Sequence, residues 1–192
     1  IISSGFFGML SGSPTSNVLT TGTLTIPTMK RCGYPATYAA AVEACASTGG
    51  ALMPPVMGAA AFIMANFLNV PYADVVVAAF LPALLFYFAL FIQTDFYAGR
   101  NNLRGVGADE VPPLMATLVS GWYYIAAIVG LTVLLLVWRL EGEAPFWISL
   151  FLVVVALVRA RQIGFTPYRF AGLVVDIGQS VAQIIGLIAG IG

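Results

Sequence analysis

The chain contains no histidine and few charged residues of either sign. Of its 192 residues, 8 are Lys or Arg and 8 are Asp or Glu, so charged residues make up 8% and the formal net charge is zero. A soluble domain carries roughly 25% charged residues. The balanced charge gives no reason to expect nucleic acid as a partner. The lack of histidine removes the commonest metal ligand and general base.

Cysteine is scarce as well, since only Cys32 and Cys45 occur. They are isolated residues in or near apolar segments, and their spacing fits neither a zinc site nor a disulfide framework. Burial as small hydrophobic side chains is the simpler interpretation. The chain begins without Met and ends inside an apolar run, so we expect it to be part of a longer polypeptide.

Apolar sequence is abundant, because 60% of the residues are hydrophobic. This composition predicts an integral membrane protein, and we expect it to be all-α. A spanning helix needs about 20 apolar residues. We predict such helices at 72–98, 112–140 and 144–160, and a further apolar segment begins at 171. Pro82 predicts a kink in the first of them.

The first seventy residues follow a different pattern. Residues 1–10 are too short to span a bilayer, and the polar stretch SGSPTSNV and a Thr-rich arm follow them. We predict a re-entrant helical hairpin over residues 1–29, with the polar stretch at its tip. Residues 36–68 are too long for one simple crossing, and the sequence ASTGGALMPP interrupts them. We therefore predict a discontinuous helix there.

Basic residues predict the orientation of the chain. If the hairpin returns to the side that it entered, seven basic residues gather on one side of the membrane and only Arg139 lies on the other. The positive-inside rule makes the first side cytoplasmic. The seven residues are Lys30, Arg31, Arg100, Arg104, Arg159, Arg161 and Arg169.

Two interrupted polar segments, SGSPTSN and STGGALMPP, are thus expected at membrane depth. Backbone groups cannot remain unpaired in hydrocarbon, so such segments persist where they are buried in protein or line a wet cavity. Carbonyl and hydroxyl oxygens at helix ends suit a small cation, and N–H groups at helix N-termini favour a carboxylate. Paired discontinuous segments are typical of a secondary transporter's binding site. The same small residues could also serve helix packing alone.

The two segments belong to longer motifs that resemble a known family. FGMLSGSPTSNVLTTGTLTIPTMKRCGY, followed by AAAVEACASTGGALMPPVMGAAAFIMA, resembles the large membrane subunit (M subunit) of tripartite ATP-independent periplasmic (TRAP) transporters. The second motif is nearest to the branch in which the small and large membrane subunits are fused. The resemblance is strong over about residues 6–104. Where this chain has Pro14 and Ser16, the family usually has small residues, often Ala.

This resemblance implies a permease that imports organic acids, such as C4-dicarboxylates or other carboxylates, by sodium symport. It implies a periplasmic substrate-binding protein and a small membrane subunit, separate or fused, as partners. It also implies a multi-pass protein in the lipid bilayer of the bacterial or archaeal cytoplasmic (inner) membrane, with Na⁺ as coupling ion, no cofactor and no enzymatic activity. The implied fold is one half of an inverted-repeat, elevator-type transporter. Residues 1–104 would be the first transport repeat, 105–170 connecting or scaffold helices, and 171–192 the truncated start of the second repeat.

The resemblance further assigns roles to residues at the two breaks. Pro54 and Pro55 would fix the second break and start the second half-helix. A sodium and substrate site would be formed by Ser11, Gly12, Ser13, Asn17, Thr48, Gly49 and Gly50, and the Na⁺ ligands within it would be Ser13, Asn17 and Thr48. Two of these ligands have a simpler alternative role: Asn17 could be a turn or cap residue, and Thr48 could hydrogen bond to its own helix.

Glu43 is an acidic residue inside a predicted span, which makes it a functional candidate. It could be a proton-coupling carboxylate, or it could pair with Lys30 or Arg31 or hydrogen bond to a neighbouring helix.

Two other functional classes stay open. A passive channel or scaffold could use polar broken segments too. An intramembrane enzyme has less support, because a serine type would need a histidine partner and Asp95 and Asp176 lie near span ends.

Overall fold

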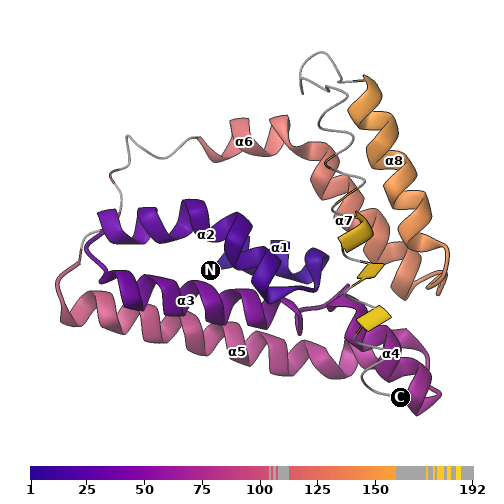
Figure 1. The fold of residues 1–192 in the computed structure, drawn as a ribbon, viewed down its shortest axis with the longest axis horizontal. Coiled ribbons are helices and arrows are strands. Elements are labelled where there is room, and N and C mark those ends of the chain that lie inside the picture. Colours follow the sequence, from indigo (N-terminus) through magenta and orange to yellow (C-terminus); the bar gives the residue numbers. More distant parts are fainter. Residues whose placement is uncertain are drawn as a thin grey trace.

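The computed structural model is built of α-helices, and no strand occurs in the part of the chain that it describes (Figure 1). The predicted all-α fold is therefore confirmed for that part. Some residues of the sequence predictions lie outside the described residues: Arg104, Arg159, Arg161, Arg169, Asp176 and most of the predicted second-repeat start at 171–192. The structure describes residues 1–103, 105, 107, 113–158, 172, 175, 177–179, 181–182 and 185–186.

The chain begins with a helical hairpin formed by α1 (Ile2–Ser11) and α2 (Pro14–Arg31). Gly12, with φ at 62°, ends α1 in the left-handed conformation, and its N–H donates to the Gly8 carbonyl at 2.9 Å. Such a conformation favours glycine. Ser13 caps α2 by accepting a hydrogen bond from the Ser16 N–H at 3.4 Å, and Pro14 occupies the first helical position. The turn of the hairpin is thus only two residues long.

The Thr-rich arm of the hairpin is helical although its composition is polar. The Thr20 hydroxyl donates to the Ser16 carbonyl at 2.9 Å, and the Thr28 hydroxyl donates to the Leu24 carbonyl at 2.7 Å. These bonds satisfy exposed hydroxyls within the helix itself. The outer face of α2 can therefore lie against an apolar environment.

The predicted discontinuous helix consists of α3 (Ala36–Gly50) and α4 (Gly58–Leu68), with residues 51–57 between them. We call residues 51–57 the break. α5 (Tyr72–Arg100) then runs back along α3 and continues through Pro82 as one helix (Figure 1). Within the described ranges it is the one helix long and apolar enough to cross a membrane by itself. Its 29 residues correspond to about 44 Å.

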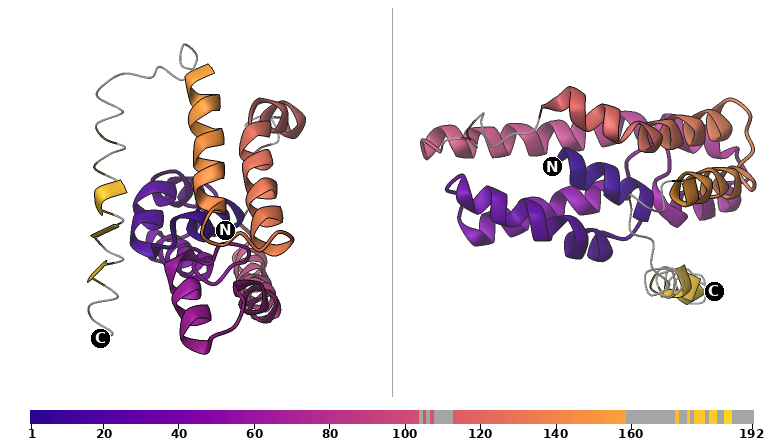
Figure 2. Two further views of the ribbon diagram at one scale, coloured as in Figure 1. Left: turned by 90° about the vertical axis from the view of Figure 1, so that its right-hand side faces the viewer. Right: turned by 90° about the horizontal axis from the view of Figure 1, so that it is seen from above.

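The segment at 112–140 differs from its prediction as one unbroken span. It contains α6 (Leu114–Ser120) and α7 (Trp122–Leu136), which Gly121 separates. Gly121 has φ −105° and ψ 14°, outside the helical region, and glycine is a weak helix former. α8 (Ala144–Val158) packs against α7, as Figure 2 also shows.

Two apolar clusters hold these helices together. Val42, Ala46 and Leu90 join α3 to α5. A larger cluster joins α4 and α5 to α7 and α8. Many large apolar side chains on the outer faces of α5 and α8 remain exposed, which fits contact with lipid. The larger cluster consists of Met57, Ala61, Ala65, Tyr72, Val76, Leu131, Leu135 and Ala144.

One end of the molecule is basic and aromatic. Lys30 and Arg31 end α2, and Arg100 ends α5 at the same end (Figure 1). Three tyrosine rings stack there, with centroids as close as 3.9 Å; they belong to Tyr34, Tyr38 and Tyr97. Aromatic rings beside basic residues are typical of a membrane interface on the cytoplasmic side.

Candidate functional site

The hairpin lies along the break, and two pairs of glycines make the contact. A Cβ atom at Gly50 would lie 2.6 Å from the Cα of Gly8, and a Cβ atom at Gly12 would lie 2.6 Å from the Cα of Gly58. No side chain fits at such distances without displacing backbone. Gly8 therefore lies against the end of α3, and Gly12 lies against the start of α4. Each of the two interrupted segments that the sequence singles out thus contacts a glycine that flanks the other segment.

The predicted site residues at the tip and at the end of α3 lie on two sides. Ser11 ends α1, and its Oγ accepts a hydrogen bond from the Ser13 N–H at 3.5 Å. Gly12, between Ser11 and Ser13, lies against Gly58, whereas Gly50 lies against Gly8 of α1. Gly49 instead packs against Phe86 of α5. The structure thus places Gly50 at the contact between α3 and α1, and Gly49 at the α3–α5 contact.

Asn17 and Thr48 lie on different surfaces. The Asn17 side chain is fully buried inside the hairpin, where its Nδ2 donates to the Ser4 carbonyl at 2.7 Å. The Thr48 side chain is exposed, and its hydroxyl donates to the Ala44 carbonyl of its own helix at 2.8 Å. Of the side chains at the end of α3, it is Ser47 that faces the hairpin, at 3.1 Å from the Ser4 hydroxyl. A role for Asn17 and Thr48 in binding sodium stays a prediction.

The prediction that Pro54 and Pro55 start the second half-helix is wrong. Both lie within the break, and α4 begins at Gly58. The backbone turns left-handed at Met57 and Gly58, with φ of 52° and 63°, so a helix cannot run from Pro55 into α4. The Tyr72 hydroxyl of another helix lies 2.8 Å from the Pro55 carbonyl and 2.6 Å from the Val56 carbonyl. In a helix that started at Pro55, these carbonyls would accept from N–H groups four residues later.

Tyr72 is a site residue that sequence reasoning missed. Its side chain is 0% exposed, and its ring stacks on Phe62 of α4 with centroids 4.1 Å apart. Its backbone N–H donates to Glu141 Oε1 at 2.9 Å, so the loop between α7 and α8 caps the start of α5. Nothing in the sequence around Tyr72 indicates that it binds carbonyls 16 and 17 residues earlier.

The comparison with protein families decides what this arrangement belongs to. The model of one family matches residues 1–192: Tripartite ATP-independent periplasmic transporter, DctM component. The chain belongs to this family. It is therefore part of the permease of a TRAP transporter, and the resemblance to the M subunit is confirmed. No curated protein and no solved structure matches the chain.

The DctM chain also holds a polar cluster inside its hairpin, and Glu43 is at the centre. Its side chain is 1% exposed, and hydroxyl groups from three helices surround its carboxyl group. Ser4 on α1 donates at 2.8 Å and Thr25 on α2 at 2.7 Å. Thr21 and Ser47 complete the group. This is the hydrogen bonding to neighbouring helices that the sequence left open for Glu43.

A regular spacing in the DctM sequence could have revealed this cluster. Asn17, Thr21 and Thr25 recur every four residues on α2, and Glu43 and Ser47 are four residues apart on α3. Residues at this spacing share one face of a helix. Two polar stripes on apolar helices indicate that those helices face one another.

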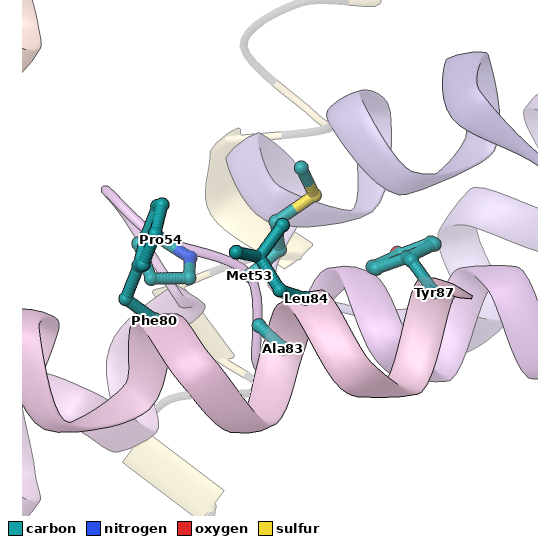
Figure 3. A pocket seen from close by; sticks show the side chains of 6 residues that line it. All are labelled: Met53, Pro54, Phe80, Ala83, Leu84 and Tyr87. Carbon is teal, nitrogen blue, oxygen red and sulfur yellow. The ribbon is translucent and has the colours of Figure 1, made fainter. Parts of the chain in front are cut away.

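On the other side of the break, the DctM chain has a small apolar hollow of about 70 Å³. Met53 and Pro54 of the break line it together with four residues of α5 (Figure 3). The Tyr87 hydroxyl donates to the Ala46 carbonyl at 2.8 Å, so its polar end is already engaged. Because the lining offers a cation almost no oxygen, the hairpin side of the break is the better place for one. The residues of α5 are Phe80, Ala83, Leu84 and Tyr87.

Proposed function

We propose that the chain is the first repeat of the permease of a sodium-coupled transporter that imports organic acids. The substrates would be C4-dicarboxylates or other carboxylates, which a periplasmic substrate-binding protein delivers. A small membrane subunit, separate or fused, would complete the permease in the bacterial or archaeal cytoplasmic (inner) membrane. Na⁺ would be the coupling ion, and no catalytic step would be involved.

The contact between Gly12 and Gly58 is the observation that carries this proposal. It places the polar tip of a hairpin directly against the start of α4, next to the non-helical break, in an otherwise apolar chain. Oxygens of hydroxyl groups and backbone carbonyls are the ligands that hard cations take. The start of α4 adds backbone N–H groups, which favour the carboxylate of a substrate. Both kinds of ligand that symport of an organic acid requires are thus close together.

The side-chain oxygens of the predicted site differ in how available they are to coordinate a small cation. Ser11 and Ser13 lie at the tip with hydroxyls engaged in weak contacts of 3.5 and 3.4 Å. The hydroxyl of Thr48 donates to its own helix, and Asn17 is bound inside the hairpin. We therefore assign Na⁺ chiefly to Ser11, Ser13 and carbonyls of the break, with Asn17 orienting the tip. Thr48 would have to rotate its hydroxyl to take part.

The test is uptake by the complete transporter in liposomes, with its binding protein supplied outside. Labelled C4-dicarboxylates and other organic acids are offered with an inward sodium gradient, with equal sodium on both sides, and with potassium alone. We expect accumulation against the substrate gradient with the sodium gradient only. Flux that merely equilibrates the substrate, without need for sodium or binding protein, would indicate a passive channel and overturn the proposal.

A further inference from the structure

We propose that Glu43 is a proton-binding site inside the hairpin, and that Thr21 carries its protonation state to Asn17. The ligand is the proton itself, and the site consists of a buried carboxyl group and the hydroxyls around it. This inference stands on hydrogen-bond geometry and does not require the sodium coupling proposed above.

A buried carboxylate inside a membrane segment needs compensation for its charge. An ion pair would be the usual form, but no Lys or Arg in the described part of the chain pairs with Glu43. On α2, Lys30 and Arg31 lie at the far end of the helix, beyond Thr25. The hydroxyls around Glu43 stabilise its carboxylate by hydrogen bonds but leave the charge in place, whereas a bound proton removes it.

The other titratable groups on the elements around Glu43 are few. α1 contributes none, because no side chain of Ile2–Ser11 is titratable. α3 itself contributes the thiol of Cys45, which is exposed. α3 also carries the phenol of Tyr38 towards the basic end, and α5 contributes the phenol of Tyr87, which is engaged with a carbonyl of α3. None of them hydrogen bonds to the Glu43 carboxyl group.

The hydroxyl of Thr21 has more acceptors than protons. Its Oγ1 lies within hydrogen-bond distance of Glu43 Oε1, and it is 3.0 Å from Asn17 Oδ1. A threonine hydroxyl carries one proton, so it can donate one full hydrogen bond at a time. When Glu43 is a carboxylate, the proton of Thr21 points to Oε1, and Asn17 Oδ1 loses its donor.

Protonation of Glu43 reverses this chain of hydrogen bonds. A proton from water binds Oε1, and the new O–H donates to Thr21 Oγ1. The hydroxyl of Thr21 then turns to Asn17 Oδ1, so every acceptor in the chain has a donor. The charge of the cluster changes from −1 to 0, and hydroxyl rotations suffice. Because Asn17 Nδ2 also donates to the Ser4 carbonyl of α1, the proton at Glu43 affects the bond between the two arms of the hairpin.

Infrared difference spectroscopy of the complete transporter in lipid, stepped through a range of pH, tests the site directly. We expect a carbonyl band of a protonated carboxylic acid that grows as the pH falls and is lost in Glu43→Gln. Glu143→Gln serves as the matched control, because Glu143 is exposed and lies in the turn before α8, away from the hairpin. An identical band in Glu43→Gln would overturn the proposal, and so would the absence of any such band in the folded wild type.

Two further variants keep the test informative if Glu43→Gln does not fold. Glu43→Asp retains a titratable group, so its band should remain with a shifted midpoint. Thr21→Val removes the hydroxyl that connects Glu43 to Asn17, and Thr21→Ser retains it. We expect the pH dependence of uptake to flatten in Thr21→Val and to persist in Thr21→Ser. Equal pH profiles in the two Thr21 variants would contradict the connection.

Sodium dependence is measured on the same preparations at one fixed pH. A wild type without sodium dependence, but with the carboxylic acid band, would refute the proposed coupling ion and leave the proton site standing. A sodium-dependent wild type without the carboxylic acid band would refute the proton site and leave the proposed coupling ion standing.

Discussion

Gly12 is the residue at which one added methyl group should have the largest effect. In Gly12→Ala, the new Cβ would lie 2.6 Å from the Gly58 Cα, and the residue would have to keep a φ of 62°. The left-handed conformation alone costs a non-glycine residue about 1–2 kcal/mol. We therefore expect the initial rate of uptake to fall by roughly tenfold or more, which transport assays with the complete protein would measure.

Gly99→Ala is the matched control for this prediction. A Cβ atom at Gly99 meets nothing within 4 Å, and the residue lies inside α5. Alanine in a helix is more favourable than glycine by about 1 kcal/mol. Its uptake should equal that of the wild type. Equal rates for both variants would mean that the hairpin tip tolerates displacement from the break.

The hydroxyl of Tyr72 can be removed without removing its ring. Tyr72→Phe keeps the stacking on Phe62 but removes the one O–H proton that the carbonyls of Pro55 and Val56 share. An unsatisfied buried polar group costs about 1–3 kcal/mol. We expect a lower melting temperature and a weaker response to sodium, because the break loses its fixed conformation.

Tyr97→Phe provides the comparison, since its ring lies in the aromatic stack at the basic end. It should leave both the melting temperature and the sodium response near those of the wild type. The contact between Tyr72 and the break would be unimportant if the two variants behaved alike.

Single residues also show where reasoning from sequence stops. Thr48 and Ser47 are neighbours of similar chemistry, and the resemblance selected Thr48. The helix directs Ser47 toward the hairpin and Thr48 outward, where its hydroxyl donates to Ala44. Adjacent helical positions differ by about 100° in direction, so which of them faces inward depends on the partner helices rather than on local composition.

At the scale of elements, α5 depends on a cap from outside its own sequence. Its N-cap residue is Pro71, which has no side-chain donor or acceptor, and Glu141 accepts the hydrogen bond of the Tyr72 N–H instead. We expect Glu141→Ala to lower the free energy of unfolding by about 1 kcal/mol, as the loss of a helix cap does.

Glu141→Gln is the informative partner of that variant. It retains an oxygen acceptor and removes the negative charge that favours a helix N-terminus. Its stability, measured by denaturation in detergent, should lie between those of the wild type and Glu141→Ala. A neutral effect of both substitutions would show that water replaces Glu141 as the cap.

The break between α3 and α4 was predictable as a feature but not in its extent. Gly49-Gly50 and Pro54-Pro55 mark it in the sequence, and α3 does end at Gly50. The start of α4 at Gly58 depends on the hydroxyl of Tyr72 and on the contact with Gly12, neither of which is local. Gly121 is the converse case, since a single glycine inside a long, mostly apolar segment did not indicate an interruption.

At the scale of the whole molecule, the charge distribution predicts which end faces the cytoplasm. Cys32 lies directly after Lys30 and Arg31, at the end where Arg100 also lies. Val70 lies in the turn between α4 and α5, at the other end (Figure 1). In inside-out membrane vesicles, a membrane-impermeant maleimide should modify Cys32 when the other cysteines are replaced. In right-side-out vesicles it should modify Val70→Cys in a Cys32→Ser background, and the reverse pattern would contradict the assigned orientation.

The overall class of this chain follows from few and general properties. Low charge and long apolar segments are enough to predict a helical membrane protein, because hydrocarbon leaves the backbone few alternatives. The assembly of the site is different, because Ser4, Thr21 and Glu43 come from three helices and their hydrogen bonds depend on how those helices pack. Composition does not contain that information, and only the four-residue spacing of the polar stripes indicates part of it.

The glycine pairs between the hairpin and the broken helix have a consequence for reversibility. A contact of ordinary side chains restricts their rotamers each time it forms, at a cost of up to about 2 kcal/mol for a long side chain. Gly8 with Gly50, and Gly12 with Gly58, touch through backbone atoms and have no rotamers to restrict. The hairpin tip can therefore leave the break and return to it with almost no change in side-chain entropy, which makes this surface suited to repeated opening and closing.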